Sequence, residues 1–118
     1  MLKEKVKKRI LDYIKKNGSI TYAEIENVMT AAGFEWQGTL CACSDQNQSV
    51  IFWEGWNIAA LSLVAELMKS GMVSREPCHW LNYLIGGKYL NLPLVKQFTE
   101  YQTDHWLPCL FVLGGGKA

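Results

Sequence analysis

The sequence lacks the signatures of the common enzyme classes. It contains no G-x-x-x-x-G-K-[ST] phosphate loop, no G-x-S-x-G nucleophile elbow, no H-E-x-x-H metal motif and no G-x-G-x-x-G dinucleotide motif. Only two histidines are present, His79 and His105, each near a cysteine in the sequence, Cys78 or Cys109. Proximity in the sequence does not establish a catalytic geometry. We therefore expect a protein that is not an enzyme and has no catalytic residues.

Hydrophobic runs long enough to span a membrane are also missing. No apolar stretch approaches the roughly 18–20 consecutive residues that a transmembrane helix needs. The N-terminal sequence MLKEKVKKRI is basic, and no apolar segment follows it as in a secretory signal. Hydrophobic residues make up 49% of the 118 positions and charged residues 19%, as in globular proteins. We expect a cytoplasmic protein with one domain at residues 1–113 and a flexible Gly-rich tail at 114–118.

The cysteines are poorly spaced for metal binding. The sequence contains four cysteines, Cys41, Cys43, Cys78 and Cys109. Structural zinc sites usually use pairs of the form C-x₂₋₄-C, and Cys41 and Cys43 are one residue too close for this pattern. There is no second pair. In a reducing compartment, cysteines among apolar residues are expected to be buried free thiols. The sequence therefore predicts no metal site and no cofactor.

Helical signals dominate the first third of the chain. A helix is predicted over residues 2–16, with an apolar stripe formed by Val6, Ile10, Tyr13 and Ile14. Residues 19–21 are too short for a helix and are typical of a single bridging strand. Thr21 then caps a second helix, because Glu24 follows three residues later as in a capping box. This helix is expected to end at Gly33.

A third helix is the element around which the rest of the chain is organised. Asn57 is a good N-cap, and apolar residues then recur with helical spacing as far as Gly71, which is a C-cap candidate. Residues 72–76 follow directly as a predicted strand. A helix that ends in L-M-K-S-G-M-V and passes straight into a strand is typical of the third helix of a winged helix-turn-helix domain, where it enters the wing.

One segment departs from this pattern. A helix-turn-helix joins its two helices by roughly 3–4 residues, whereas residues 34–56 separate the second and third helices here. Residues 39–43 and 50–53 are rich in β-formers, and the polar stretch 44–48 between them favours a turn. We interpret the insertion as a β-hairpin that covers the start of the third helix.

Strand signals continue toward the C-terminus. Residues 79–85 and 89–92 flank a Gly-Gly-Lys sequence at 86–88 and predict a second hairpin. Residues 95–102 favour either a helical turn or an irregular loop. The apolar run 107–113, interrupted only by a proline, predicts a strand that is buried on both faces. The expected fold class is therefore α+β, a winged helix-turn-helix-like domain of three helices with an inserted β-hairpin and a C-terminal β-wing sheet.

Three stretches of sequence resemble a known family. The segments VIFWEGWN, YLIGGKYLNLPLVK and HWLPCLFVL are similar to those of small proteins from staphylococcal pathogenicity islands and related prophages. The resemblance covers roughly residues 5–113 and includes no catalytic signature. It implies a winged-helix type of fold and a mobile-element context, meaning replication, regulation or interference with a helper phage. It transfers no functional residue.

The cations are concentrated at one end of the chain. Residues 1–17 carry a net charge of +5, whereas the remainder carries −4. Such a basic helix could neutralise phosphates without reading sequence, or it could simply be a solvated face. The candidate nucleic-acid-binding residues are Lys5, Lys8, Arg9, Lys15, Lys16 and Lys88. The third helix is a poor recognition helix, because its expected open face has Glu66 in its middle and Lys69 as its only cation.

Aromatic residues suggest a second kind of surface. Trp53, Trp56 and Tyr89 are the candidate partner-binding residues, because Trp and Tyr dominate protein-binding hot spots. The same side chains could stack on single-stranded bases, or they could simply fill the core. The sequence therefore predicts a non-enzymatic accessory protein of a mobile element that binds nucleic acid with little sequence preference. The alternative is a module that binds or inhibits a replication, packaging or host protein.

Overall fold

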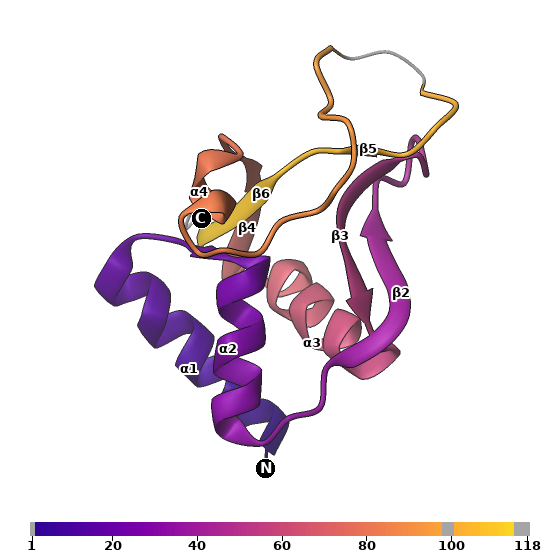
Figure 1. The fold of residues 1–118 in the computed structure, drawn as a ribbon. Helices are drawn as coiled ribbons and strands as arrows, with labels where there is room; N and C mark the ends of the chain where they lie inside the picture. The colour runs from indigo at the N-terminus through magenta and orange to yellow at the C-terminus, as the bar shows by residue number, and fades with distance from the viewer. Residues whose placement is uncertain (1, 98–100, 115–118) are drawn as a thin grey trace.

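The computed structural model describes residues 2–97 and 101–114, which form an α+β fold with four helices and two small sheets. The elements in chain order are α1 (Leu2–Asn17), β1 (Ile20–Thr21), α2 (Tyr22–Ala32), β2 (Gln37–Cys43), β3 (Val50–Trp56), α3 (Ile58–Lys69), β4 (Val73–Pro77), α4 (Leu81–Leu84), β5 (His105–Trp106) and β6 (Cys109–Leu113) (Figure 1). The three predicted helices, the bridging strand and the inserted hairpin are all present.

The helix ends confirm the capping signals in the sequence. Thr21 and Glu24 form the predicted capping box at the start of α2, with both reciprocal hydrogen bonds present. Gly33 ends α2 in the left-handed region, with φ of 79°, which glycine adopts without a steric penalty. At the start of α3, the Asn57 side chain accepts a hydrogen bond from the Ala60 N–H at 2.8 Å.

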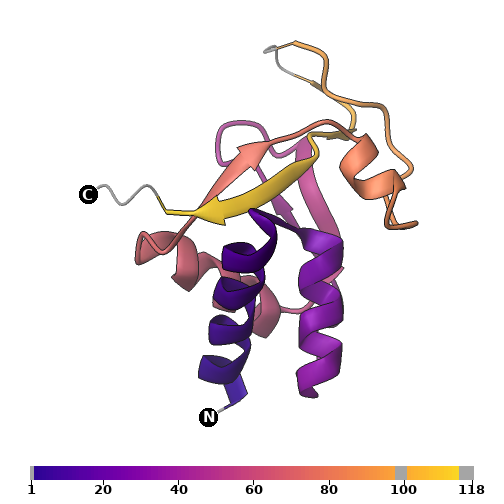
Figure 2. The same ribbon diagram turned by 90° about the vertical axis from the view of Figure 1, so that its left-hand side faces the viewer.

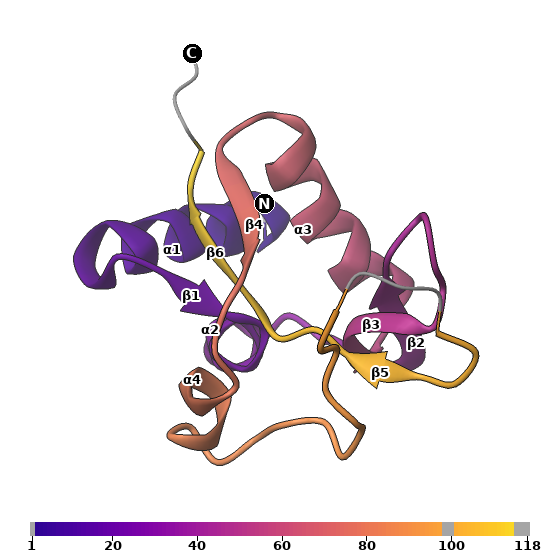
Figure 3. The same ribbon diagram turned by 90° about the horizontal axis from the view of Figure 1, so that it is seen from above.

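The first sheet pairs a strand from the N-terminal part of the chain, β1, with one from the C-terminal part, β6. Its strand order is β1-β6-β4, with β6 antiparallel to both neighbours (Figure 3). Helices α1, α2 and α3 all lie on one side of this sheet (Figure 2). The apolar run near the C-terminus is divided at Pro108, so that β6 starts only at Cys109. Cys109 and Phe111 are buried, Leu110 and Val112 on the other face are only half-buried, and Leu113 is exposed, so the predicted burial of this strand on both faces is wrong.

The second sheet contains the inserted hairpin. Its strand order is β2-β3-β5, and the short β5 runs parallel to β3. Between the two sheets, the chain leaves α4 and crosses over to the second sheet before it reaches β5 (Figure 3).

The predicted hairpin over residues 79–92 is wrong. Residues 81–84 form the single helical turn α4, and residues 89–92 form no strand. The side chains of His79 and Asn82 explain the turn, because His79 Nδ1 accepts from the Leu81 N–H and Asn82 Nδ2 donates to the His79 carbonyl. The buried Tyr83 then anchors α4, since its hydroxyl donates to the Cys109 carbonyl and accepts from the Tyr22 N–H. No wing sheet forms from this segment.

The remaining expectations concern loops and the tail. Residues 95–97 and 101–102 are irregular, and 98–100 lie outside the described residues. Gly114, assigned to the flexible tail, is held to the sheet because its N–H donates to the Met72 carbonyl at 2.7 Å. Residues 115–118 of the predicted tail also lie outside the described residues.

Candidate functional site

The outer side of α1 presents a basic surface. We call its five exposed cations, Lys5, Lys8, Arg9, Lys15 and Lys16, the basic face. Only Lys8 has a carboxylate partner within 4 Å among the described residues, Asp12 at 3.1 Å. The stripe of Val6, Ile10 and Ile14 is buried on the opposite side of the helix, which directs these cations outward. The structure therefore brings together five of the six cations that the sequence predicted.

A shallow hollow lies within the basic face. Arg9 and Lys16 line it together with Asp12, Tyr13 and Asn17, and its volume is about 470 Å³. The Tyr13 hydroxyl donates to Glu24 at 2.7 Å, and this hydrogen bond raises the pKa of Tyr13 to about 12. The Tyr13 side chain that lines the hollow is therefore uncharged at neutral pH and is held in place by this hydrogen bond. Two cations converging on one hollow are suited to the oxygens of a phosphate group.

Two further lysines of α1 are neutralised within the protein. Lys3 and Lys7 both contact the Glu66 carboxylate of α3, at 2.6 and 2.7 Å. The hydrogen bonds from Lys3 and Lys7 lower the pKa of Glu66 to about 2. The sequence placed Glu66 on an open face of the third helix, and no local signal indicated a partner about 60 residues away.

Titration of Glu66 is the direct measure of this pairing. Its pKa lies at about 2 in the folded chain, against an ordinary value of 4.5. The pairs therefore stabilise the fold above pH 4.5, and this contribution is lost as the pH falls toward 2. In a carboxyl ¹³C NMR titration, the variant Lys3→Met/Lys7→Met should return the Glu66 pKa toward its ordinary value. Lys8→Met is the control and should leave it low, because Lys8 pairs with Asp12. An unchanged Glu66 pKa in the double variant would contradict the pairing.

Lys88 does not join the basic face. Its ammonium group donates to Oε1 of Glu26, a carboxylate on α2 that is only 3% exposed. The other oxygen, Oε2, accepts from the indole N–H groups of Trp53 at 2.7 Å and Trp56 at 2.8 Å. Lys88 also lies 4.7 Å from the ring centroid of Trp36. The prediction that Lys88 binds phosphate is corrected, because its charge is committed to this carboxylate.

The aromatic candidates separate into two groups. Trp53 and Trp56 are each 1% exposed, so the expectation that they lie in an exposed patch is wrong. Both pack around Tyr22 in the core, where they satisfy their indole N–H groups on Glu26. Tyr89 is 54% exposed and remains available to a partner.

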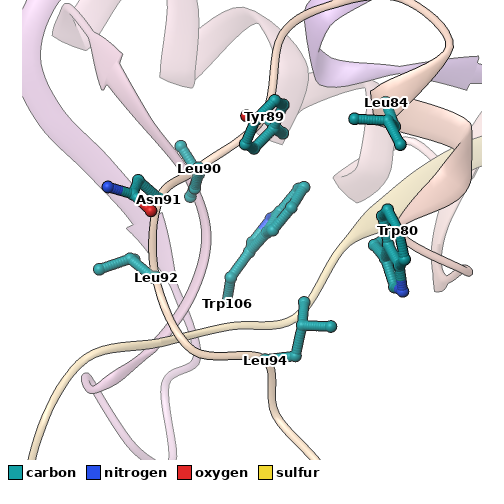
Figure 4. Close-up of a pocket in the computed structure, with 8 residues that line it drawn as sticks. All are labelled: Trp80, Leu84, Tyr89, Leu90, Asn91, Leu92, Leu94 and Trp106. Atoms are coloured by element: carbon teal, nitrogen blue, oxygen red, sulfur yellow. The ribbon is translucent and has the colours of Figure 1, made fainter.

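An apolar surface that the sequence did not predict surrounds α4. We call it the α4 patch, and its exposed members are Trp80, Leu81, Leu84, Ile85 and Tyr89. Ile85 is the extreme case, with 88% of its surface exposed. Next to the patch is a pocket of about 300 Å³, where the Trp106 ring lies between Trp80 and Leu84 on one side and the segment 89–94 on the other (Figure 4). The i, i+4 spacing of 80 with 84 and 81 with 85 is the signal that could have indicated it.

The insertion contacts the N-cap of α3 but does not cover the start of the helix as expected, because Ile58 and Ala59 remain exposed. The Asn57 side chain donates to the Glu35 carbonyl at 3.0 Å, and the Asn57 N–H donates to the Trp36 carbonyl at 2.8 Å. The first exposed side chain of the helix, Ile58, is apolar and 67% exposed. A base edge approaching this end of α3 would meet an alkyl group and no free hydrogen-bonding side chain from Asn57.

The cysteines are all free thiols, and they are not gathered into a metal site. Cys41 is exposed, which differs from the predicted burial, whereas Cys109 is buried. Across residues 2–97 and 101–114, no three His, Cys, Asp or Glu side chains come close enough to hold a metal ion.

No helix in the same ranges combines the length and apolar character needed to cross a membrane. Comparisons with protein-family models, curated proteins and solved structures give no match.

Proposed function

We propose that this chain is a non-enzymatic, winged-helix-type accessory protein of a mobile genetic element, and that it binds nucleic acid in the cytoplasm with little sequence preference. The winged-helix assignment is supported by the order of α1, β1, α2, α3, β4 and β6 and by the sheet order β1-β6-β4. Two insertions elaborate this plan, namely the β2–β3 hairpin and the long excursion from α4 to β5 in place of a wing hairpin. The mobile-element context is supported by the resemblance of sequence.

The observation that carries the proposal is the basic face of α1. Four of its five cations, Lys5, Arg9, Lys15 and Lys16, have no carboxylate within 4 Å among the described residues. Exposed cations of this kind gain free energy by displacing counterions from a phosphate backbone, and this gain does not depend on the bases. The contribution of α3 to base reading is expected to be small, because Glu66 is paired with two lysines and the Asn57 side chain at the N-terminal end is hydrogen-bonded to the insertion.

Charge reversal on the basic face is the test. The variant Lys5→Glu/Arg9→Glu should bind a DNA duplex at least about tenfold more weakly, and the slope of log K against log salt should fall by about two, since each phosphate contact contributes about 0.9. The matched control Lys69→Glu/Lys96→Glu changes the net charge equally at exposed positions outside the basic face. Fluorescence anisotropy over a salt series measures both quantities. Equal losses in the two variants would mean that only net charge matters, and binding unchanged by Lys5→Glu/Arg9→Glu would make the basic face a solvated surface.

A second function, binding of a protein partner, is favoured by the α4 patch. Trp80, Leu84 and Tyr89 line one pocket, and Leu81 and Ile85 are exposed in or next to the same helical turn; exposed apolar surfaces of this kind mark protein interaction sites. This surface replaces the Trp53 and Trp56 patch expected from the sequence. Tyr89, at its edge, supplies the type of aromatic anchor that hot spots use.

Substitution within the patch tests this second function. Ile85→Asp should reduce the recovery of a protein partner that stays bound after nuclease treatment by about tenfold or more. The reason is that a central hot-spot residue contributes about 2 kcal/mol to binding. The source of the partner is cells that carry the element. The matched control is Ile58→Asp, which places the same charge at an exposed isoleucine on α3. Quantitative mass spectrometry after affinity capture is the measurement. Equal recovery with both variants would show that the patch is not the interface.

A further inference from the structure

A cleft separates the inserted hairpin from α3. It has a volume of about 250 Å³, and Arg75 of β4 is among the residues that line it. We call it the hairpin–α3 cleft. Its lining residues are Tyr22, Cys41, Ala42, Cys43, Leu61, Val64, Ala65, Met68 and Arg75. Apart from Arg75 and Tyr22, the side chains are alkyl groups, the Met68 thioether and the thiols of Cys41 and Cys43.

Arg75 is a half-buried cation without a counterion. Its guanidinium carbon lies 3.8 Å from the centroid of the Phe52 ring, and its Nη1 donates to the Tyr22 hydroxyl at 3.2 Å. No carboxylate among the described residues lies within 4 Å of it. A guanidinium has five N–H donors in a planar fork, and only one of these is used by a side chain here. The remaining donors match the two oxygens of a carboxylate.

The cleft does not supply an anion of its own. Burial raises the pKa of Tyr22 to about 12, so its hydroxyl is neutral at physiological pH. Burial, followed by the neighbouring Cys43 and then by the carboxylates of Asp104 and Glu54 outside the lining, also raises the pKa of the Cys41 thiol. A half-buried charge that is not paired is unfavourable, and an incoming anion would remove that penalty.

We propose that the hairpin–α3 cleft binds a small molecule with one carboxylate, which pairs with Arg75, and a short apolar body, which packs between the hairpin and α3. The apolar lining disfavours a phosphate ester, because a doubly charged group would meet one cation and otherwise alkyl side chains. The volume is below the roughly 300–1,000 Å³ typical of drug-sized sites, which points to a compact ligand. This site lies on other elements than the basic face and does not depend on nucleic-acid binding.

Octanoate is the probe, with 1-octanol and octylamine as neutral and cationic probes of equal chain length. In NMR titrations of the full chain, octanoate should shift the Met68 methyl and Arg75 guanidinium resonances. Its affinity by calorimetry should exceed that of 1-octanol by about tenfold, which corresponds to about 1.4 kcal/mol. Octylamine should bind most weakly. Equal affinity for the three probes, or no shift with millimolar octanoate, would overturn the proposal.

Two variants locate the site. Arg75→Gln removes the charge but keeps an amide donor for the Tyr22 hydroxyl, and it should abolish the preference for octanoate over 1-octanol. Ala65→Phe fills the cleft from an exposed position of α3 and should block all binding even if Arg75→Gln proves unstable. Ile85→Asp, in the α4 patch, should bind octanoate normally.

Two outcomes would overturn the assignment of the site, namely NMR shifts confined to Trp80 and Leu84, or unaltered octanoate binding in Ala65→Phe. Displacement of octanoate by a peptide with a C-terminal leucine, but not by its amide, at higher affinity would overturn the small-molecule ligand in favour of a protein terminus.

Discussion

Replacing Glu26 by Ala is expected to lower the free energy of unfolding by about 2–6 kcal/mol, because two buried indole N–H groups would lose their acceptor at a cost of about 1–3 kcal/mol each. The carboxylate is 3% exposed and accepts three hydrogen bonds, from Trp53, Trp56 and Lys88. Without it, two buried indole N–H groups lose their acceptor and the Lys88 ammonium loses its counterion. These donors come from β3 and from the loop after α4, so one carboxylate on α2 ties three segments together.

Urea unfolding followed by circular dichroism is the measurement. Glu26→Gln should cost less than Glu26→Ala, because an amide oxygen can still accept from an indole N–H although the charge pair with Lys88 is lost. Glu54→Ala is the matched control, an exposed glutamate on β3, and should change the unfolding free energy by no more than about 0.5 kcal/mol. A loss below about 1 kcal/mol in Glu26→Ala would show that the donors find other partners.

The parts of the fold that local patterns determine were predictable from the sequence. The capping box of Thr21 and Glu24, the Asn57 cap and the apolar stripe of α1 each involve residues within a few positions of one another. The inserted hairpin was predictable for the same reason, since its turn is a run of consecutive polar residues. The Gly-Gly-Lys turn signal at 86–88 misled the prediction at residues 79–85, where the side chains of His79 and Asn82 fold the chain into α4.

The candidate sites were predictable only where exposure follows from helix periodicity. The basic face emerged because Val6, Ile10 and Ile14 fix the buried side of α1. Trp53 and Lys88 were misassigned because their common partner, Glu26, is 27 and 62 residues away in the sequence. Pairing of such distant side chains depends on the packing of α2 against the second sheet, which no local pattern encodes.

Replacing Gly38 by Ala is expected to lift the inserted hairpin from the start of α3. A Cβ atom at Gly38 would lie 2.6 Å from the Trp56 carbonyl oxygen and 2.7 Å from the Asn57 nitrogen. These are backbone atoms that cannot rotate away, so the start of β2 has to move. Overpacking of this kind costs about 1–3 kcal/mol, and here it should also break the hydrogen bond from the Asn57 N–H to Trp36.

Amide hydrogen exchange at Asn57 measures this displacement. The DNA affinity of the same variants tests the proposed function. Exchange at Asn57 should accelerate in Gly38→Ala and remain slow in Thr39→Ala, which removes an exposed side chain from the same strand without a clash. Affinity for DNA should stay the same in both variants, because the basic face is on α1. Unaltered exchange in Gly38→Ala would mean that the hairpin is not seated on α3 as described. If the displaced hairpin instead gave sequence-specific protection of a duplex, α3 would be the reading element and the basic face would not account for binding.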